Sequence, residues 1–194
     1  MYRLGCSASN SSLVLQGWQD NGTNQYNAGQ WSRILGGDGM ECFVDWSNPD
    51  IQYAESQYGN IARSDDGGNN FQGITNNINE NGEWVTPWAQ HPTSAATIFA
   101  GYENVWKSTN RGDSWTKISN LNIGGLTILE VSKSNPANIY ISNGSAIFKT
   151  ANGGTNWNSV VVPTAGSIFI IMFSICLDCR AHPYIRVSKT RGIF

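Results

Sequence analysis

Three acidic residues in the N-terminal third lie where a carboxylate could meet a ligand. Asp38 has glycine on both sides, and Asp20 lies two residues before a glycine. Glycine neighbours leave the Asp38 carboxylate uncovered and let its backbone approach a ligand closely. Glycoside hydrolysis needs two carboxylates, roughly 6.5–9.5 Å apart in an inverting enzyme. Asp38 and Asp20 are therefore the candidate catalytic residues, with Glu41 in reserve. The alternative is that both aspartates form Asx turns, which are common beside glycine.

Tryptophan is the second group with chemical potential, because sugar rings stack on aromatic faces while Asn, Gln and Asp bind their hydroxyls. The chain has 8 Trp, and several lie beside polar turns. The alternative role is packing between sheets, since each Trp buries a large apolar area. The candidates for this role are not residues of the repeated motif described below: Trp18, Trp46, Trp84, Trp88 and Trp106.

Metal and cofactor chemistry have little support. Cys176 and Cys179 have the spacing of a zinc or redox pair, but zinc needs two further ligands and His182 is the only one nearby. We interpret them as ordinary strand-edge residues and predict no metal and no cofactor. The 4 Cys are too few and too scattered for a disulfide scaffold.

A repeated motif indicates which elements position these residues. A hydroxyl residue is followed by Asp or Asn two positions on, Gly four on and an aromatic seven on. The three copies start 44 and then 42 residues apart. An X-Pro step keeps the same period at Asn48-Pro49, His91-Pro92 and Asn135-Pro136, so we interpret His91 as a turn residue. The motif residues are Ser64, Asp66, Gly68 and Phe71; Ser108, Asn110, Gly112 and Trp115; Thr150, Asn152, Gly154 and Trp157.

The chemistry of the motif predicts a hairpin turn between the third and fourth strands of each unit. Asp or Asn accepts backbone N–H groups, Gly supplies a positive φ, and the aromatic side chain is buried. Two of the three copies carry Asn instead of Asp, which argues against calcium binding or catalysis there. The expected strands are 41–46, 52–56, 60–64 and 71–74; 84–89, 97–102, 104–108 and 115–118; 126–131, 138–142, 146–150 and 156–161.

Four short strands per unit of this length predict an all-β chain made of four-stranded antiparallel β-propeller blades. We divide the chain into a part-blade at 1–35, blades at 36–80, 81–122 and 123–162, and a truncated or aberrant blade at 163–194. A shifted reading frame is an alternative explanation for that last segment. About three and a half blades are visible, so we expect an incomplete propeller.

The three motifs resemble the Asp-box, or BNR repeat, S-x-D-x-G-x-[TS]-[WF], of sialidases, xyloglucanase-like glycoside hydrolases and sortilin-type receptors. The resemblance covers residues 13–162. It implies boxes on the outer part of the blades, remote from the central funnel. Xyloglucanase-like enzymes use two carboxylates in a cleft between two propellers. Sialidases need three arginines to bind the substrate carboxylate. Arg33, Arg63 and Arg111 could be considered, but Arg63 and Arg111 lie at or beside the boxes, away from the funnel, so a sialidase is the less favoured member of the group.

Composition limits the function further. Charged residues make up 13% and the net charge is −2, so no basic field for nucleic acid is present. The chain has neither an apolar run long enough to span a bilayer nor a signal peptide. We expect part of a secreted or cell-surface propeller that binds or hydrolyses a glycan. The alternatives are a protein-interaction propeller of sortilin or assembly-factor type, and a non-functional gene fragment.

Overall fold

The computed structural model describes residues 2–161 and shows an all-β chain of four antiparallel sheets, each with four strands. Sheet 1 contains β1 (Arg3–Cys6), β2 (Val14–Trp18), β3 (Gly22–Asn27) and β4 (Gln30–Leu35). Sheet 2 contains β5 (Cys42–Val44), β6 (Gln52–Ser56), β7 (Asn60–Ser64) and β8 (Gln72–Gly73), with a 3₁₀ turn η1 at Gln57–Gly59. Sheet 3 contains β9 (Trp88–Gln90), β10 (Ile98–Gly101), β11 (Val105–Ser108) and β12 (Thr116–Lys117). Sheet 4 contains β13 (Ile128–Val131), β14 (Ile139–Ser142), β15 (Ile147–Thr150) and β16 (Asn158–Val160).

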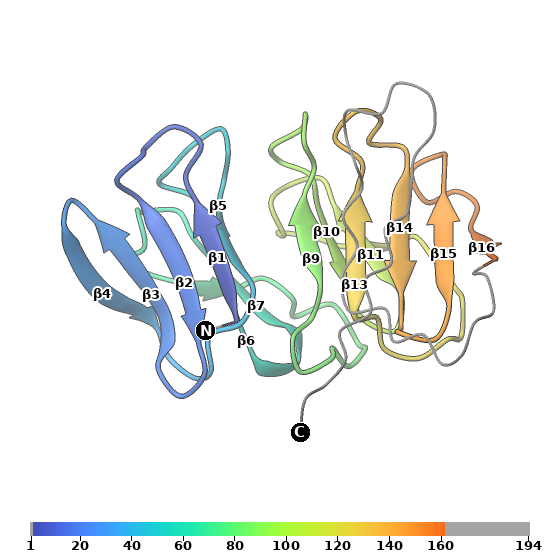
Figure 1. Cartoon of the computed structure of the whole chain (residues 1–194), viewed down its shortest axis with the longest axis horizontal. Helices are drawn as coiled ribbons and strands as arrows, with labels where there is room; N and C mark the ends of the chain where they lie inside the picture. The colour runs from blue at the N-terminus through green and yellow to red at the C-terminus, as the bar shows by residue number, and fades with distance from the viewer. Residues whose placement is uncertain (1, 162–194) are drawn as a thin grey trace, which may run out of the picture.

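Each sheet is a meander in which strands that follow one another in the chain are neighbours. The first strands, β1, β5, β9 and β13, lie toward the middle of the molecule, and β4 and β16 lie at its two outer ends (Figure 1). This is the blade arrangement of a β-propeller, and the ring of sheets is not closed. The all-β class and the incomplete propeller predicted from the repeat are therefore confirmed.

Sheet 1 has all four strands, whereas the sequence indicated only a part-blade at 1–35. Its first strand, β1, pairs along its length with β2. The pattern of β1 is hard to recognise because Gly5 lies against the backbone of β5, where a side chain would collide with Cys42 and Phe43. Each sheet falls inside one predicted unit, whereas the boundaries themselves stay predictions. The segment 163–194, with Cys176, Cys179 and His182, lies outside the described residues.

Successive strands of a meander run in opposite directions, so their connections alternate between two faces of the molecule. One face carries the connections between sheets (36–41, 74–87 and 118–127) and the turns between second and third strands. We call it the connection face. The opposite face carries the three motif turns (64–71, 108–115 and 150–157), which we call the box turns; this side is the box face.

Apolar side chains fill the spaces between neighbouring sheets. Leu15 and Cys42 pack between sheets 1 and 2, and Phe99 and Ile141 between sheets 3 and 4. Between sheets 2 and 3, the ring of Phe43 lies 4.4 Å from Trp88 and 4.9 Å from Tyr53, centroid to centroid. These layers hold the sheets side by side around an axis. The part of the chain that the structure describes has no helix that is long and apolar enough to cross a membrane.

Candidate functional site

The three box turns share one hydrogen-bond pattern. In the second, the Ser108 hydroxyl donates to Asn110 Oδ1 at 2.9 Å and accepts the N–H of Gly112 at 2.8 Å. Asn110 Oδ1 also accepts the N–H of Ser114 at 3.0 Å. The turns that begin at Ser64 and Thr150 repeat these bonds. The motif residues therefore close a turn with their side chains, and none of these bonds leaves the turn.

The aromatic residue of each box turn packs on the preceding sheet. Trp115 donates its indole N–H to the carbonyl of Ile74 at 2.7 Å, and Trp157 donates to the carbonyl of Ile118 at 2.8 Å. Phe71 has no N–H and packs against the apolar layer between sheets 1 and 2. The box turns thus connect neighbouring sheets.

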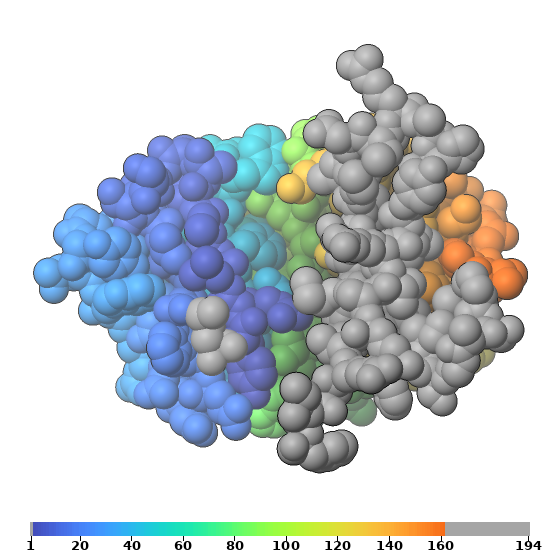
Figure 2. All heavy atoms as spheres, in the orientation of Figure 1, coloured from blue at the N-terminus to red at the C-terminus, as the bar shows by residue number. Residues whose placement is uncertain are grey.

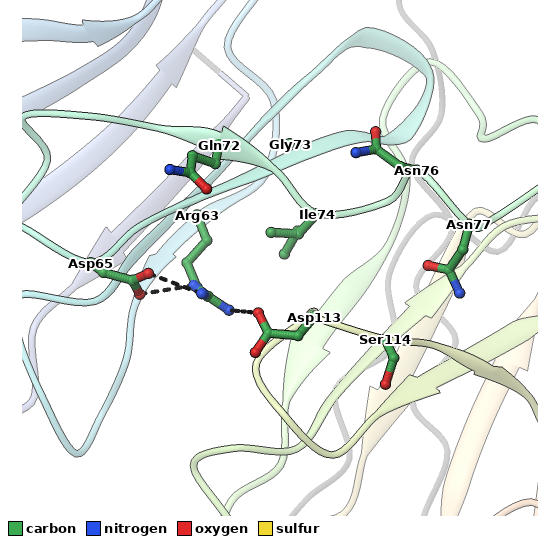
Figure 3. Close-up of a pocket in the computed structure, with 10 residues that line it drawn as sticks. Arg63, Asp65, Gln72, Gly73, Ile74, Asn76, Asn77, Asp113 and Ser114 are labelled. Carbon is green, nitrogen blue, oxygen red and sulfur yellow. Dashed lines mark hydrogen bonds and ion pairs between the residues drawn. The ribbon is translucent and has the colours of Figure 1, made fainter.

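A polar groove of about 540 Å³ lies between sheets 2 and 3 beside a box turn (Figure 3). At one end, Arg63 bridges Asp65 and Asp113, with N–O distances of 2.8 Å to each. Arg111 binds the buried Asp45 at 3.0 Å on the same face of the molecule. Both arginines are engaged in joining sheets 2 and 3, so they do not form the substrate clamp that a sialidase requires.

The structure brings the two predicted catalytic aspartates together on the connection face. Asp38 Oδ1 accepts the backbone N–H of Asp20, and Asp38 Oδ2 accepts the side-chain N–H of Gln57 at 2.8 Å. Asp20 has a φ of 64°, a conformation that this contact supports. The half-buried Asp38 carboxylate is therefore engaged on both oxygens, in contrast to the uncovered carboxylate that its glycine neighbours predicted.

A cavity of about 610 Å³ opens where the first strands of all four sheets converge. We call it the axial cavity. Its lining includes Arg3 from β1, Trp88 from β9 and Glu130 from β13, together with Glu41 just before β5. Arg3 Nε binds Glu41 Oε2 at 2.7 Å, whereas Glu130 has no ion pair among the described residues. Two carboxylates and one guanidinium thus face one solvent-filled space.

The two axial glutamates have perturbed acidity. Burial raises the pKa of Glu41 above its usual value, although the ion pair with Arg3 opposes this. Burial, and next the negative charge of Glu41, raises the pKa of Glu130. A raised pKa is the direction of shift that favours a carboxyl group acting as a general acid.

Glu55 lies beneath this cavity and is fully buried. It accepts the N–H of Thr86 at 2.8 Å and the indole N–H of Trp88 at 3.1 Å. Burial raises its pKa to about 8. The contacts place Glu55 between sheet 2 and the 74–87 connection, where it positions Trp88 in the cavity wall.

The tryptophans divide between the two predicted roles. Trp88 is buried, Trp106 donates to Glu80 at 2.9 Å, and Trp46 donates to the His91 carbonyl at 3.0 Å across the junction of sheets 2 and 3. Trp84 is 37% exposed and meets the 59%-exposed Tyr58 edge to face, with ring centroids 5.2 Å apart. This aromatic pair stands on the connection face, beside Val85 of the axial cavity.

Arg3, Tyr58 and Glu130 were not predicted as site residues from the sequence. None carries a local signal, because each reaches the connection face or the axial cavity only once the sheets are arranged around the axis. His91 behaves as the predicted turn residue, accepting the N–H of Thr93 at 3.2 Å. The described residues contain no group of three or more His, Cys, Asp or Glu side chains able to hold a metal ion.

The fold places the chain in the class of β-propellers. No protein-family model and no curated protein sequence matches it. Solved structures do match it, and the three described next each align with 84% of this chain. An ancestral GH74 enzyme has a TM-score of 0.69 at 18% identity over 24% of its own length. The GH74 xyloglucanase from Xanthomonas campestris has 0.62 at 16% over 30%, and YCF48 from Cyanidioschyzon merolae has 0.61 at 14% over 57%. The chain thus spans between a quarter and just over half of these propellers, and identities this low show the fold alone.

Proposed function

We propose that the chain is part of an extracellular Asp-box β-propeller that binds a glycan on its connection face. The observation that carries the proposal is the exposed pair Tyr58–Trp84 beside the axial cavity with Glu41 and Glu130. Aromatic faces stack on sugar rings, and carboxylates accept hydrogen bonds from sugar hydroxyls. The matching of the box turns to the Asp-box pattern and the GH74 neighbours support this assignment.

A more specific form of the proposal is that the axial cavity hydrolyses the bound glycan. Glu130, with its raised pKa and no ion pair among the described residues, would be the general acid. Glu41, whose carboxylate is held by Arg3, would be the base or nucleophile. The catalytic role of Asp38 and Asp20 stays a prediction from the sequence. The reducing-sugar assay described below tests it as well.

The first test is binding of xyloglucan and β-glucan oligosaccharides to the whole chain by isothermal titration calorimetry. Trp84→Ala should weaken binding about tenfold or more, since the ring stacking is lost. Trp46→Ala is the matched control, because Trp46 is exposed to a similar extent (39%) but lies on the box face. Equal effects of the two substitutions, or no binding by the wild-type chain, would contradict the proposal.

Reducing-sugar release then tests hydrolysis. Glu130→Gln should abolish it and leave oligosaccharide binding in place, because the amide keeps the shape of the side chain but cannot donate the proton. Release that survives Glu130→Gln and is lost in Asp38→Asn would move catalysis to the aspartates.

A protein-interaction propeller is the second candidate. The axial cavity has two carboxyl groups, Glu41 and Glu130, but only one guanidinium, Arg3. The excess acidic group could bind a basic side chain of a partner protein. A structure of YCF48 bound to D1 peptide is among the neighbours, with a TM-score of 0.50 at 12% identity. Binding of Lys- or Arg-containing peptides that weakens in Glu130→Gln, with no oligosaccharide binding, would favour this candidate.

A further inference from the structure

Sheet 1 has one packed face and one open face. Leu15 and Gln25 point toward sheet 2 and are buried. Leu4 (55% exposed), Trp18 (40%) and Trp31 (55%) lie on the opposite side. In Figure 2 sheet 1 forms the left-hand end of the molecule, and no other part of the described chain lies over it. We call this side the open face.

Trp31 occupies the same register position as the box aromatics. In sheets 2, 3 and 4, the box aromatic comes directly before a fourth-strand residue that pairs with the third strand. The third-strand partner is Arg63 in sheet 2, Lys107 in sheet 3 and Lys149 in sheet 4. In sheet 1, Trp31 directly precedes Ser32, which pairs with Gln25. The box turn is replaced here by a two-residue hairpin at Ala28 and Gly29, both with positive φ. The turn has therefore changed, whereas the aromatic position has not.

At the other three positions this aromatic packs on the preceding sheet. Trp115 is only 6% exposed, and its indole N–H is bound to the Ile74 carbonyl. Trp157 makes the equivalent bond to the Ile118 carbonyl. Within residues 2–161 Trp31 has no such neighbour, and its ring contacts Tyr26 of its own sheet at 5.2 Å between centroids. Trp31 therefore occupies the position from which the other aromatics join two sheets, but among these residues it contacts only its own sheet.

The matching acceptor surface, the carbonyl to which such an indole would donate, lies at the end of sheet 4. The carbonyls that accept from Trp115 and Trp157 belong to residues three positions after the preceding box aromatic, Ile74 after Phe71 and Ile118 after Trp115. The corresponding residue of sheet 4 is Val160, three positions after Trp157 and at the end of β16. Its neighbour Val161 is 91% exposed.

We propose that the open face of sheet 1 docks the sheet 4 end of a second copy of this chain, with Trp31 as the anchor and the Val160 carbonyl as its acceptor. The contact is head to tail, because different surfaces of the two copies meet. Two copies supply eight sheets, which lies within the four to eight blades of closed propellers. The inference is independent of the ligand on the connection face.

Sedimentation velocity over a concentration series tests the proposal on the whole chain. The wild-type chain should form a dimer, and Trp31→Ser should weaken association about tenfold or more, as expected for a central aromatic anchor. Leu4→Ser, a second change on the same face, should weaken it too. Trp46→Ser is the matched control, because Trp46 is an exposed tryptophan on the box face at the junction of sheets 2 and 3, and it should leave association unchanged. Thermal melts would establish that each variant is folded.

Val161→Asp separates a head-to-tail contact from a symmetric one. It should weaken association as Trp31→Ser does, because a charge then stands beside the acceptor strand. A dimer that is lost in Trp31→Ser and unaffected by Val161→Asp would mean that two open faces meet each other, and would overturn the proposal. A wild-type chain that stays monomeric throughout the series would overturn it as well.

Discussion

The indole N–H of Trp88 donates to the carboxyl group of Glu55 at 3.1 Å, and both side chains are buried. Glu55 belongs to sheet 2 and Trp88 to sheet 3, so the bond crosses a sheet junction directly beneath the axial cavity. The wall of that cavity is thus fixed by a buried acid.

This acid should make the stability of the chain depend on pH. Burial raises the pKa of Glu55 from 4.5 to about 8, so between these values the folded chain binds a proton that the unfolded chain has released. The free energy of unfolding should therefore fall as pH rises through this interval, by about 5 kcal/mol, and level off above it. Urea unfolding near both ends of the interval measures the change. Glu55→Gln should flatten the profile, and an unchanged profile would mean that another group is responsible.

Gly112 should tolerate alanine far less well than Gly153. Gly112 has a φ of 95°, and an added Cβ would collide with the side chain of Ile74. Gly153 also has a positive φ, but nothing lies within 4 Å of its Cβ position. We expect Gly112→Ala to cost about 2–4 kcal/mol and Gly153→Ala about 1–2 kcal/mol. Equal losses in urea unfolding would show that backbone conformation alone sets the cost.

The hydroxyl group of the first residue in each box turn should contribute measurably to the free energy of unfolding. Ser108→Ala removes the acceptor of the buried Gly112 N–H, which should lower the free energy of unfolding by about 1–3 kcal/mol. Ser108→Thr should restore it, because Thr150 makes the same bond in the third turn. Thermal or urea unfolding of both variants gives the answer; a threonine variant as unstable as the alanine one would contradict the hydrogen-bond explanation.

Asp38 can be assigned to clamping or to catalysis by comparing two substitutions. Asp38→Ala removes the acceptor of the Asp20 N–H and of Gln57, and should reduce stability by about 1 kcal/mol and speed proteolysis of the turn at 19–21. Asp38→Asn keeps one acceptor oxygen and should be milder. If Asp38→Asn unfolds like the wild type yet releases no sugar where the wild type does, the residue is catalytic.

The repeat made sheets 2–4 predictable, because box and X-Pro markers delimit the strands on both sides. The ranges expected for β6 and β7, 52–56 and 60–64, match the observed strands at both ends. Sheet 1 has neither marker: a short hairpin replaces its box, and β1 contains glycine and arginine. Without these signals, only part of the sheet could be recognised.

The candidate site was less accessible to sequence reasoning than the fold. Glu41 could be named because it follows a glycine-rich loop, whereas Glu130 lies within β13 and reaches the axial cavity only through the position of sheet 4. The partner that engages Asp38, Gln57, is 19 residues away in the turn between β6 and β7. Such contacts depend on how sheets pack, and no local pattern encodes them.

The acceptors of the Trp115 and Trp157 indoles are main-chain carbonyls, which every residue type possesses. A blade can therefore recognise its neighbour with little dependence on the amino acid at the contact point. A gene encoding such an array can gain a unit by tandem duplication without a matching substitution in the adjoining unit. The same property makes coupling between blades a nearest-neighbour effect, so unfolding should begin at the terminal blades and spread inward.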